Sequence, residues 1–329
     1  MSLPTFLRPI ASVLLGVIAT TTLATSARAA GKLDEIHIDY AYYSPVSLVL
    51  KEKGFLEEDL KKDGIAVKWV LSLGSNKALE FLNAKSLDFG STAGGAALLA
   101  RINGNPVKSI YVSSKPEWTA LVTQGKSPIQ KVSDLAGKRI AVTRGTDPHI
   151  FLIRALADYG LTDKDVKLVL LQHQDGRLAL QKGDVDAWAG LDPLMAQAEV
   201  DDGARLFYRN AENNTYGVLN TREDVISDHP ELVARVIAAY EKARSWALAH
   251  PAELKKIIAD NAKISEAVAA RQLERTDLSN PVIGDRQKDT IQAAGLALQQ
   301  AGVIPADVDV RAVSSALIEP KFTSRIAVK

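Results

Sequence analysis

The sequence predicts an α/β fold built from two α/β lobes. From residue 35 onwards, short apolar segments alternate with amphipathic ones, as strands and helices do in βαβ units. An extended segment interrupts this alternation at 118–124 and again at 214–221, and the chain beyond the second is almost entirely helical. We therefore expect two lobes joined by a two-strand hinge: lobe 1 at 35–117 plus 222–329, lobe 2 at 124–215, and hinge segments at 118–123 and 216–221.

The first lobe opens with a regular series of strands and helices. Glycine is common just past the end of a helix, because its missing Cβ allows the left-handed backbone that closes the helix. Gly54 and Gly104 occupy such positions. The predicted order is strand EIHIDY, helix VSLVLKEKGF, strand IAVKWVLS, helix NKALEFLNAKS, strand LDFGST, helix GGAALLARING and strand VKSIYVSS. This order predicts a mostly parallel sheet.

The second lobe repeats the alternation after WTALVTQ. Its predicted elements are strand KRIAV, helix PHIFLIRAL, strand VKLVLLQ, helix DGRLALQKG, strand DAWAG and helix PLMAQAEVDD. Past NTYGVLNT, apolar residues recur at the three- and four-residue spacing of amphipathic helices, first in HPELVARVIAAYEKARSWALAH. We expect these helices to return to the first lobe.

The first 29 residues are typical of a secretory signal peptide. Arg8 provides the positive start, and IASVLLGVIATTTLA is apolar but too short for a good membrane span. Ala27-Arg28-Ala29 then gives the A-x-A pattern that precedes cleavage. We expect cleavage after Ala29 and a soluble mature protein in a bacterial periplasm.

Charge and sulfur content narrow the classes of function. The chain has 40 basic and 39 acidic residues, and loss of Arg8 and Arg28 leaves 38 against 39, a formal charge of −1. This near-neutral balance argues against nucleic acid as a partner. There is no cysteine, and Met195 is the only methionine beyond Met1. One interpretation is chance; the other is economy of sulfur in a protein made when sulfur is scarce.

Three predicted strands end in small polar residues that lead directly into a helix. The amide groups at a helix start have no partner in the helix and attract anions, and ligands of open α/β sheets bind at strand ends. Helix capping by these side chains is the alternative explanation for each motif. The three starts are Gly74-Ser75-Asn76, Ser91-Thr92-Ala93-Gly94-Gly95 and Gly145-Thr146. Asp147 directly follows the third, and its carboxylate would repel an anion unless it points away.

Aromatic and acidic residues near the expected cleft allow more than one interpretation. Tyr42, Tyr43, Trp118 and Trp188 could wall a ligand's tail or pack in the core. Asp192 could accept a hydrogen bond from an amino group of a ligand, close the lobes, or cap the following helix.

The histidines do not form a catalytic or metal-binding pattern. His149 alone lies at a candidate site, and no H-E-x-x-H, G-x-S-x-G or Walker motif occurs. We therefore expect no enzyme activity, no catalytic residues, no cofactor and no metal.

Five segments together resemble the periplasmic aliphatic sulfonate-binding proteins of ABC importers, whose taurine- and nitrate-binding relatives share the pattern. These segments are DYAYYSP, LGSNKALEFLNAKSLDFGSTAGGAALLA, KPEWTALVTQGKSPI, VSDLAGKRIAVTRGTDPHIFLIRAL and GDVDAWAGLDPL. The resemblance implies a type II periplasmic-binding fold that closes on a small anion by a hinge motion. It implies ligand contacts at Tyr42 to Ser44, Ser75, Asn76, Thr92 to Gly94 and Gly145 to His149, with Asp192 and Asn213-Asn214 as weaker candidates.

The resemblance therefore predicts the soluble receptor of an importer, a monomer that delivers an alkanesulfonate to a permease in the inner membrane. Taurine, nitrate or another oxyanion remains an alternative cargo. An enzyme on the same fold, similar to a pyrimidine-precursor synthase, would be cytosolic and would need a catalytic His or Cys. The effector domain of a transcription regulator would carry a DNA-binding helix-turn-helix where this chain has a signal peptide.

Overall fold

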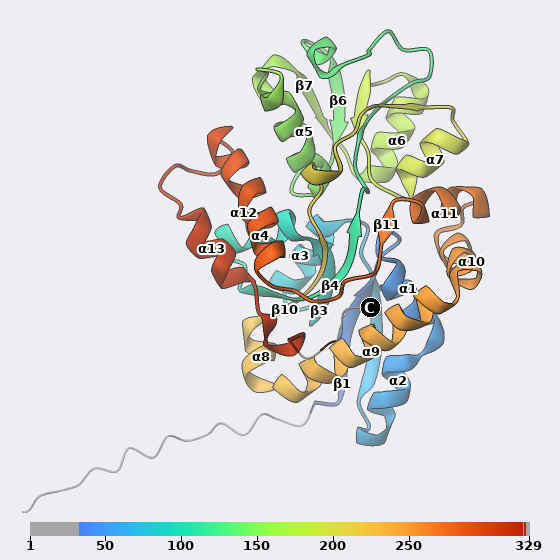
Figure 1. Ribbon diagram of the computed structural model, residues 1–329, viewed down its shortest axis with the longest axis vertical. Coiled ribbons are helices and arrows are strands. Elements are labelled where there is room, and N and C mark those ends of the chain that lie inside the picture. The colour runs from blue at the N-terminus through green and yellow to red at the C-terminus, as the bar shows by residue number, and fades with distance from the viewer. Residues whose placement is uncertain (1–32, 325, 327–329) are drawn as a thin grey trace, which may run out of the picture. The chain divides into compact units, whose positions relative to one another are not determined.

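The computed structural model describes residues 33–324 and Ile326, and the predicted signal peptide lies outside them. The described residues belong to one compact unit. It contains two β-sheets, each covered by helices (Figure 1). The α/β fold class predicted from the sequence is confirmed.

The first sheet has six strands in the order β11–β4–β10–β3–β1–β2. β1 is parallel to β2 and β3, whereas β10 runs antiparallel between β3 and β4, and β11 runs antiparallel to β4. The strands are β1 (Glu35–Tyr40), β2 (Ala66–Leu71), β3 (Phe89–Ala93), β4 (Val107–Pro116), β10 (Gly217–Arg222) and β11 (Thr276–Asp277).

The second sheet has five strands in the order β7–β6–β8–β5–β9. β6 is parallel to β7 and β8, and β5 is antiparallel to β8 and β9. Its strands are β5 (Leu121–Thr123), β6 (Arg139–Val142), β7 (Lys167–Leu170), β8 (Ala187–Ala189) and β9 (Arg205–Tyr208). Among the described strands, β1, β2, β3 and β4 of the first sheet share one direction, as do β6, β7, β8 and β9 of the second. The prediction of a mostly parallel sheet is therefore confirmed for strand direction, whereas β10, β11 and β5 run antiparallel to their neighbours.

The helices of both halves largely follow the predicted periodicity. The helices packed around the first sheet are α1 (Pro45–Lys53), α2 (Phe55–Leu60), α3 (Ser75–Asn83), α4 (Gly94–Ile102), α8 (Glu223–Asp228), α9 (Pro230–Ala249), α10 (Pro251–Ala262), α11 (Glu266–Leu273), α12 (Asp285–Gln300) and α13 (Val310–Leu317). Those of the second are α5 (Asp147–Asp158), α6 (His173–Lys182) and α7 (Leu194–Val200). Short 3-10 helices are η1 (Lys61–Asp63), η2 (Val132–Leu135), η3 (Asp163–Asp165), η4 (Ala211–Asn213) and η5 (Pro320–Phe322). The sequence reading missed α2, α8, α13, β9 and β11, each only two to eight residues long.

Five hydrophobic clusters of the described residues hold these layers together. Three involve the first sheet: one where α9 packs on α1, one where α12 packs on α4, and a small one of Val112, Tyr216, Val218 and Ile283. Two lie on the second sheet, under α5, α6 and α7. Ile150 and Ile153 of α5 belong to the cluster that contains α4 and α12. The second half is thus joined to the first by apolar packing as well as by chain connections.

The chain passes between the sheets through two short segments (Figure 1). One runs from Glu117 to Ala120 between β4 and β5, and the other from Asn214 to Tyr216 between η4 and β10. Residues 121–123 and 217–221 of the predicted hinge segments lie in β5 and β10. Among the helices of residues 33–324, none combines the length and apolar character of a membrane span.

Candidate ligand-binding site

Loops from both halves surround a cavity of about 400 Å³, which we call the strand-end pocket. The loops follow β1, β2, β7 and β8, and the segment between α10 and α11 closes one side. Most of the lining side chains are apolar or aromatic, among them Tyr42, Leu73, Leu191, Leu194 and Ile264. A pocket at the carboxyl ends of strands is where open α/β sheets bind small molecules.

Three of the predicted site residues line the strand-end pocket: Tyr42, Tyr43 and Asp192. Tyr43 is fixed, because its hydroxyl donates to the carbonyl of Ser91 at 2.8 Å and its ring packs edge-on against Trp118. The Tyr42 carbonyl accepts a hydrogen bond from the side chain of Gln272 at 2.9 Å. Next in the chain, Ser44 is buried at the start of α1, and its hydroxyl has no hydrogen-bond partner among the described residues.

The start of α3 faces the start of α6 beside this pocket. The Asn76 amide donates to the Gln172 side chain at 3.5 Å. A Cβ placed on Gly74 would lie 3.0 Å from Nε2 of His173 and 2.7 Å from Oδ1 of Asn76, so only glycine allows this approach. The predicted start at residues 74–76 is thus brought next to a helix of the other half.

His173 is a pocket residue that the sequence reading did not single out. The Thr143 hydroxyl donates to the carbonyl of Leu171 at 2.8 Å, so Nδ1 of His173, 3.2 Å from that hydroxyl, must be the donor between them. Burial lowers the pKa of His173 to about 3, so the ring is neutral and Nε2 is an acceptor. The sequence feature that could have identified His173 is its position directly after strand VKLVLLQ, where a helix begins.

The backbone amides at the start of α4 already donate hydrogen bonds to other groups of the chain. The Ala93 amide donates to the Ser75 hydroxyl at 2.9 Å, and the Gly94 amide donates to the Tyr216 carbonyl at 2.9 Å. The Thr92 hydroxyl accepts from the Asn220 amide at 2.7 Å. These three predicted contacts, Thr92 to Gly94, therefore lie buried within a polar network of the first sheet.

Asp147, at the start of α5, is 1% exposed and points at the crossing segments. Its Oδ2 accepts from the Trp118 indole at 2.8 Å and from the Thr215 amide at 2.9 Å, and its Oδ1 accepts from the Thr215 hydroxyl at 2.7 Å. Burial raises the pKa of Asp147, and the bonds from Trp118 and Thr215 oppose that rise. Thr146 occupies the cap position, but its hydroxyl donates to the Thr143 carbonyl and does not cap the helix.

Gly145 and His149 line a different cavity, of about 490 Å³, together with Arg144 and Lys164. Burial lowers the pKa of His149 to about 4, and Arg144 adds to this effect. The structure therefore divides the predicted site residues between two cavities and a buried polar network.

Two further predicted residues have well-defined surroundings. Trp188 is fully buried in the core of the second sheet, with Gly176 directly against its indole ring. Asn214 is buried in a crossing segment, and its Oδ1 accepts from the amide of Thr119 in the other crossing segment at 2.9 Å. Asn214 thus ties the two crossing segments together.

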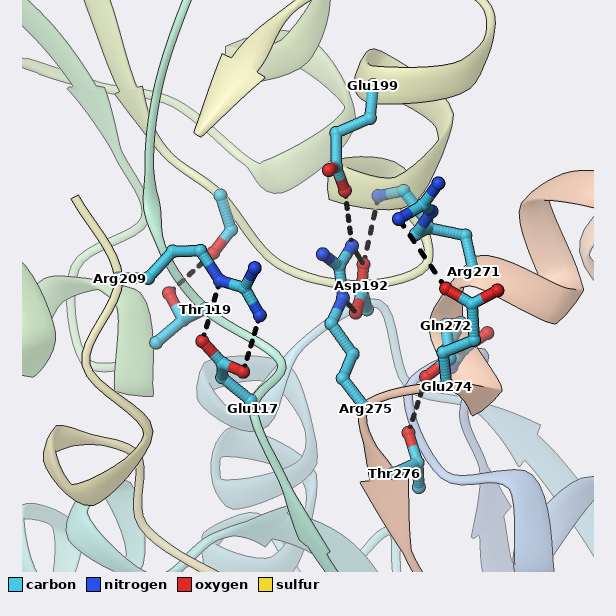
Figure 2. A network of polar contacts seen from close by, with 12 residues as sticks. Glu117, Thr119, Asp192, Glu199, Arg209, Arg271, Gln272, Glu274, Arg275 and Thr276 are labelled. Atoms are coloured by element: carbon cyan, nitrogen blue, oxygen red, sulfur yellow. Dashed lines mark hydrogen bonds and ion pairs between the residues drawn. The ribbon is translucent and has the colours of Figure 1, made fainter. Parts of the chain in front are cut away.

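Asp192 joins the halves through an ion pair (Figure 2). Its carboxylate accepts two bonds from Arg275 at 2.7 and 2.8 Å and also caps α7 by accepting from the Ala196 amide. Arg275, which lies between α11 and β11, also contacts Glu199 at 2.8 Å. Burial raises the pKa of Asp192, and Arg275 opposes the rise. From the sequence, Asp192 was a candidate for capping the helix and for closing the lobes, and it makes both kinds of contact. Its partner Arg275 was not identified from the sequence.

Known proteins are similar to this chain in sequence and in fold. The NMT1/THI5-like family matches residues 45–254. The chain belongs to this family. A protein of Bacillus subtilis (strain 168) named for binding aliphatic sulfonates is 29% identical over 257 residues, 77% of each chain. A protein of Escherichia coli (strain K12) with the same name is 31% identical over 205 residues, 62% of this chain and 63% of its own.

The fold of this family member matches a solved receptor structure. The alkanesulfonate-binding protein from Xanthomonas axonopodis pv. citri, solved with bound MOPS, superposes with a TM-score of 0.80 at 23% identity. The superposition covers 88% of this chain and 99% of that one. The predicted periplasmic-binding fold is confirmed, and the relatives named above are binding proteins rather than enzymes.

Proposed function

We propose that this family member is the substrate-binding receptor of an ABC importer and that it binds alkanesulfonates in the strand-end pocket. The observation that carries the proposal is the composition of that pocket: an apolar and aromatic wall that ends at the start of α6, with the start of α3 next to it. The relatives' names support the same ligand class.

In this proposal the alkyl tail packs on Tyr42, Leu73 and Ile264. The sulfonate accepts hydrogen bonds from amides at the first turns of α3 and α6, where helix geometry leaves donors without a partner. The anion is balanced by backbone dipoles rather than by an arginine.

The same pocket disfavours an amino group on the cargo. The sequence left taurine open as a cargo if Asp147 or Asp192 could serve as its acidic partner. Asp147 is bound by Trp118 and Thr215, and Asp192 is bound by Arg275. A free carboxylate for an ammonium group would require one of these contacts to break, so alkanesulfonates fit better than taurine.

The receptor assignment has further parts that we propose with it. The two halves close on the ligand by a hinge motion at the crossing segments, the mature protein starts at Ala30 in the periplasm, and the closed form docks as a monomer on an inner-membrane permease. The segments Glu117 to Ala120 and Asn214 to Tyr216 are the only covalent connections between the sheets in residues 33–324, which supports a hinge there.

Calorimetric titration of the ligand-free mature protein, residues 30–329, tests the ligand. The panel is ethanesulfonate, octanesulfonate, taurine, sulfate and nitrate. We expect micromolar or tighter binding of octanesulfonate, about −8 kcal/mol, with weaker binding of ethanesulfonate and no binding of sulfate. Absence of heat with every sulfonate, from a folded sample, would refute the proposed cargo.

Tyr42→Ala localises the site. It removes part of the apolar wall, so octanesulfonate should bind roughly tenfold more weakly, with a smaller loss for ethanesulfonate. The matched control is Tyr159→Ala, because Tyr159 is exposed at the far end of α5. Equal losses in the two variants would place the tail elsewhere.

A further inference from the structure

Asp147 brings a carboxylate of the chain itself to the start of α4. The Thr215 hydroxyl that donates to Asp147 also accepts the amide of Gly95, the second residue of α4, at 3.1 Å. A Cβ on Gly95 would lie 3.5 Å from Oδ1 of Asp147. The negative charge therefore lies where one of the predicted anion-binding helix starts would hold a ligand.

The contacts of Asp147 are those of a bound oxyanion. Both oxygens accept hydrogen bonds, from an indole N–H, a backbone N–H and a hydroxyl, and the group is 1% exposed. Within residues 33–324 no lysine or arginine is recorded in an ion pair with it, although the charge of Arg154, acting over a longer distance, also opposes the rise in its pKa. Neutral donors and a helix start hold small oxyanions in proteins in the same way.

The donors and the acceptor come from separate parts of the chain. Trp118 lies in one crossing segment, Thr215 lies in the other, and Asp147 lies on α5 of the second half. The donors are fixed independently of Asp147: Trp118 packs against Tyr43, and the backbone next to Thr215 is held by the bond from Gly94 to the Tyr216 carbonyl. Removal of the Asp147 side chain would leave the donors in place around a space the size of a carboxymethyl group.

We propose that Trp118 and Thr215, beside the start of α4, form an oxyanion subsite that Asp147 fills as a built-in ligand, and that Asp147 thereby determines which anions the protein accepts. While its carboxylate is in place, a second anion at the start of α4 is excluded by like charge and by lack of space. The sulfonate of the cargo must then bind beside the strand-end pocket, at α3 and α6. This consequence for the cargo rests on the proposed function, whereas the subsite itself does not.

Chemical rescue tests the subsite. Asp147→Gly removes the group that acetate can replace. We expect the variant to melt at a lower temperature than the parent protein, and 100 mM sodium acetate to raise its melting temperature by about 3 °C relative to 100 mM sodium chloride. The parent protein should show no such difference between the two salts.

Asp175→Gly is the matched control, because Asp175 also lies in the first turn of a helix of the second half but is exposed. It should show no acetate-specific shift. Equal acetate shifts in Asp147→Gly, Asp175→Gly and the parent, or no shift in any of them, would overturn the subsite.

Asp147→Asn keeps the test decisive if the glycine variant does not fold. It preserves volume but removes the negative charge, and its NH2 group can be accommodated only if the Thr215 hydroxyl stops donating and accepts instead. We expect a lower melting temperature that acetate does not restore, because the space is filled. An unchanged melting temperature would contradict the proposal.

Titration of the glycine variant separates this inference from the proposed function. With the subsite vacated, methanesulfonate and sulfate should gain binding that the parent lacks. Acetate rescue without binding of any sulfonate by the parent would refute the proposed cargo and leave the subsite. Binding of sulfonates by the parent without acetate rescue of the variant would refute the subsite and leave the cargo.

Discussion

Two buried aspartates at helix starts of the second half are held in opposite ways. Asp192 faces a full countercharge, the guanidinium of Arg275, and both side chains are below 10% exposure. Asp147 accepts hydrogen bonds only from neutral donors, on Trp118 and Thr215, and the charge of Arg154 acts on it over a longer distance. Both contacts reach from the second half to the first half or the crossing segments. A charge buried at such a junction can therefore be balanced by one strong partner or by several weak ones, and the two should respond differently to mutation.

Removal of the countercharge should have the largest effect. Arg275→Met leaves the carboxylate of Asp192 buried without a cation, next to Glu199. We expect the free energy of unfolding to fall by about 3–5 kcal/mol, measured by urea denaturation at pH 7. A loss below 1 kcal/mol would mean that water, rather than Arg275, balances Asp192.

Removal of one neutral donor should cost less. Thr215→Val nearly preserves shape but removes the hydroxyl that donates to Asp147 and accepts from Gly95. The expected loss is about 2–3 kcal/mol, because a charged acceptor and a buried amide each lose a bond. Thr290→Val on α12 is the control, since the Thr290 hydroxyl bonds only its own helix at a partly exposed position. A loss no larger than that of the control would show that Asp147 does not depend on this donor.

A third buried carboxyl group, that of Asp39, has neither a cationic partner nor a hydrogen-bond donor for each oxygen. Its Oδ1 accepts from the Ser91 amide at 2.8 Å, whereas Oδ2 has no hydrogen-bond partner among the described residues. Burial raises the pKa of Asp39 to about 7.

The folded state of Asp39 thus takes up a proton near neutrality, whereas the unfolded chain takes it up only near pH 4. The stabilisation that this group contributes is complete below about pH 4, decreases as the pH rises from there, and is absent above about pH 7. We expect the free energy of unfolding of the parent minus that of Asp39→Asn to rise by about 2 kcal/mol from pH 8 to pH 5.5. His149 and His173, whose pKa values are lowered, oppose this trend equally in both proteins. A pH-independent difference would disprove titration of Asp39.

The smallest effect is expected at an exposed pair of the same kind as Asp192 and Arg275. Arg209 makes two bonds to Glu117, at 2.8 and 2.9 Å (Figure 2), but its side chain is 53% exposed. Arg209→Met should change the free energy of unfolding by less than about 1 kcal/mol, because water already screens the pair. A loss as large as that of Arg275→Met would show that geometry, not burial, sets the cost.

The sequence by itself determined the α/β class and most of the long elements. The helical spacing of apolar residues in α9 and α12 is a local pattern, and so are the runs of apolar and β-branched residues in β1, β2 and β6. Both can be recognised from neighbouring residues alone. The order of the small polar helix starts likewise indicated the family. The two residues of β11 are too few for a period to show, whereas α13 has Val310, Val313 and Leu317 at helical spacing and was overlooked in the sequence.

Only the tertiary structure decided which strands run antiparallel and which partners each candidate site residue has. β10 inserts antiparallel between β3 and β4, residues more than a hundred positions earlier, which no local pattern encodes. Asp147 and Gly145 are two residues apart, yet one meets Trp118 and Thr215 and the other lines a separate cavity. Residue type and position fix what a side chain can accept or donate. Its partner depends on segments that only the folded chain brings together.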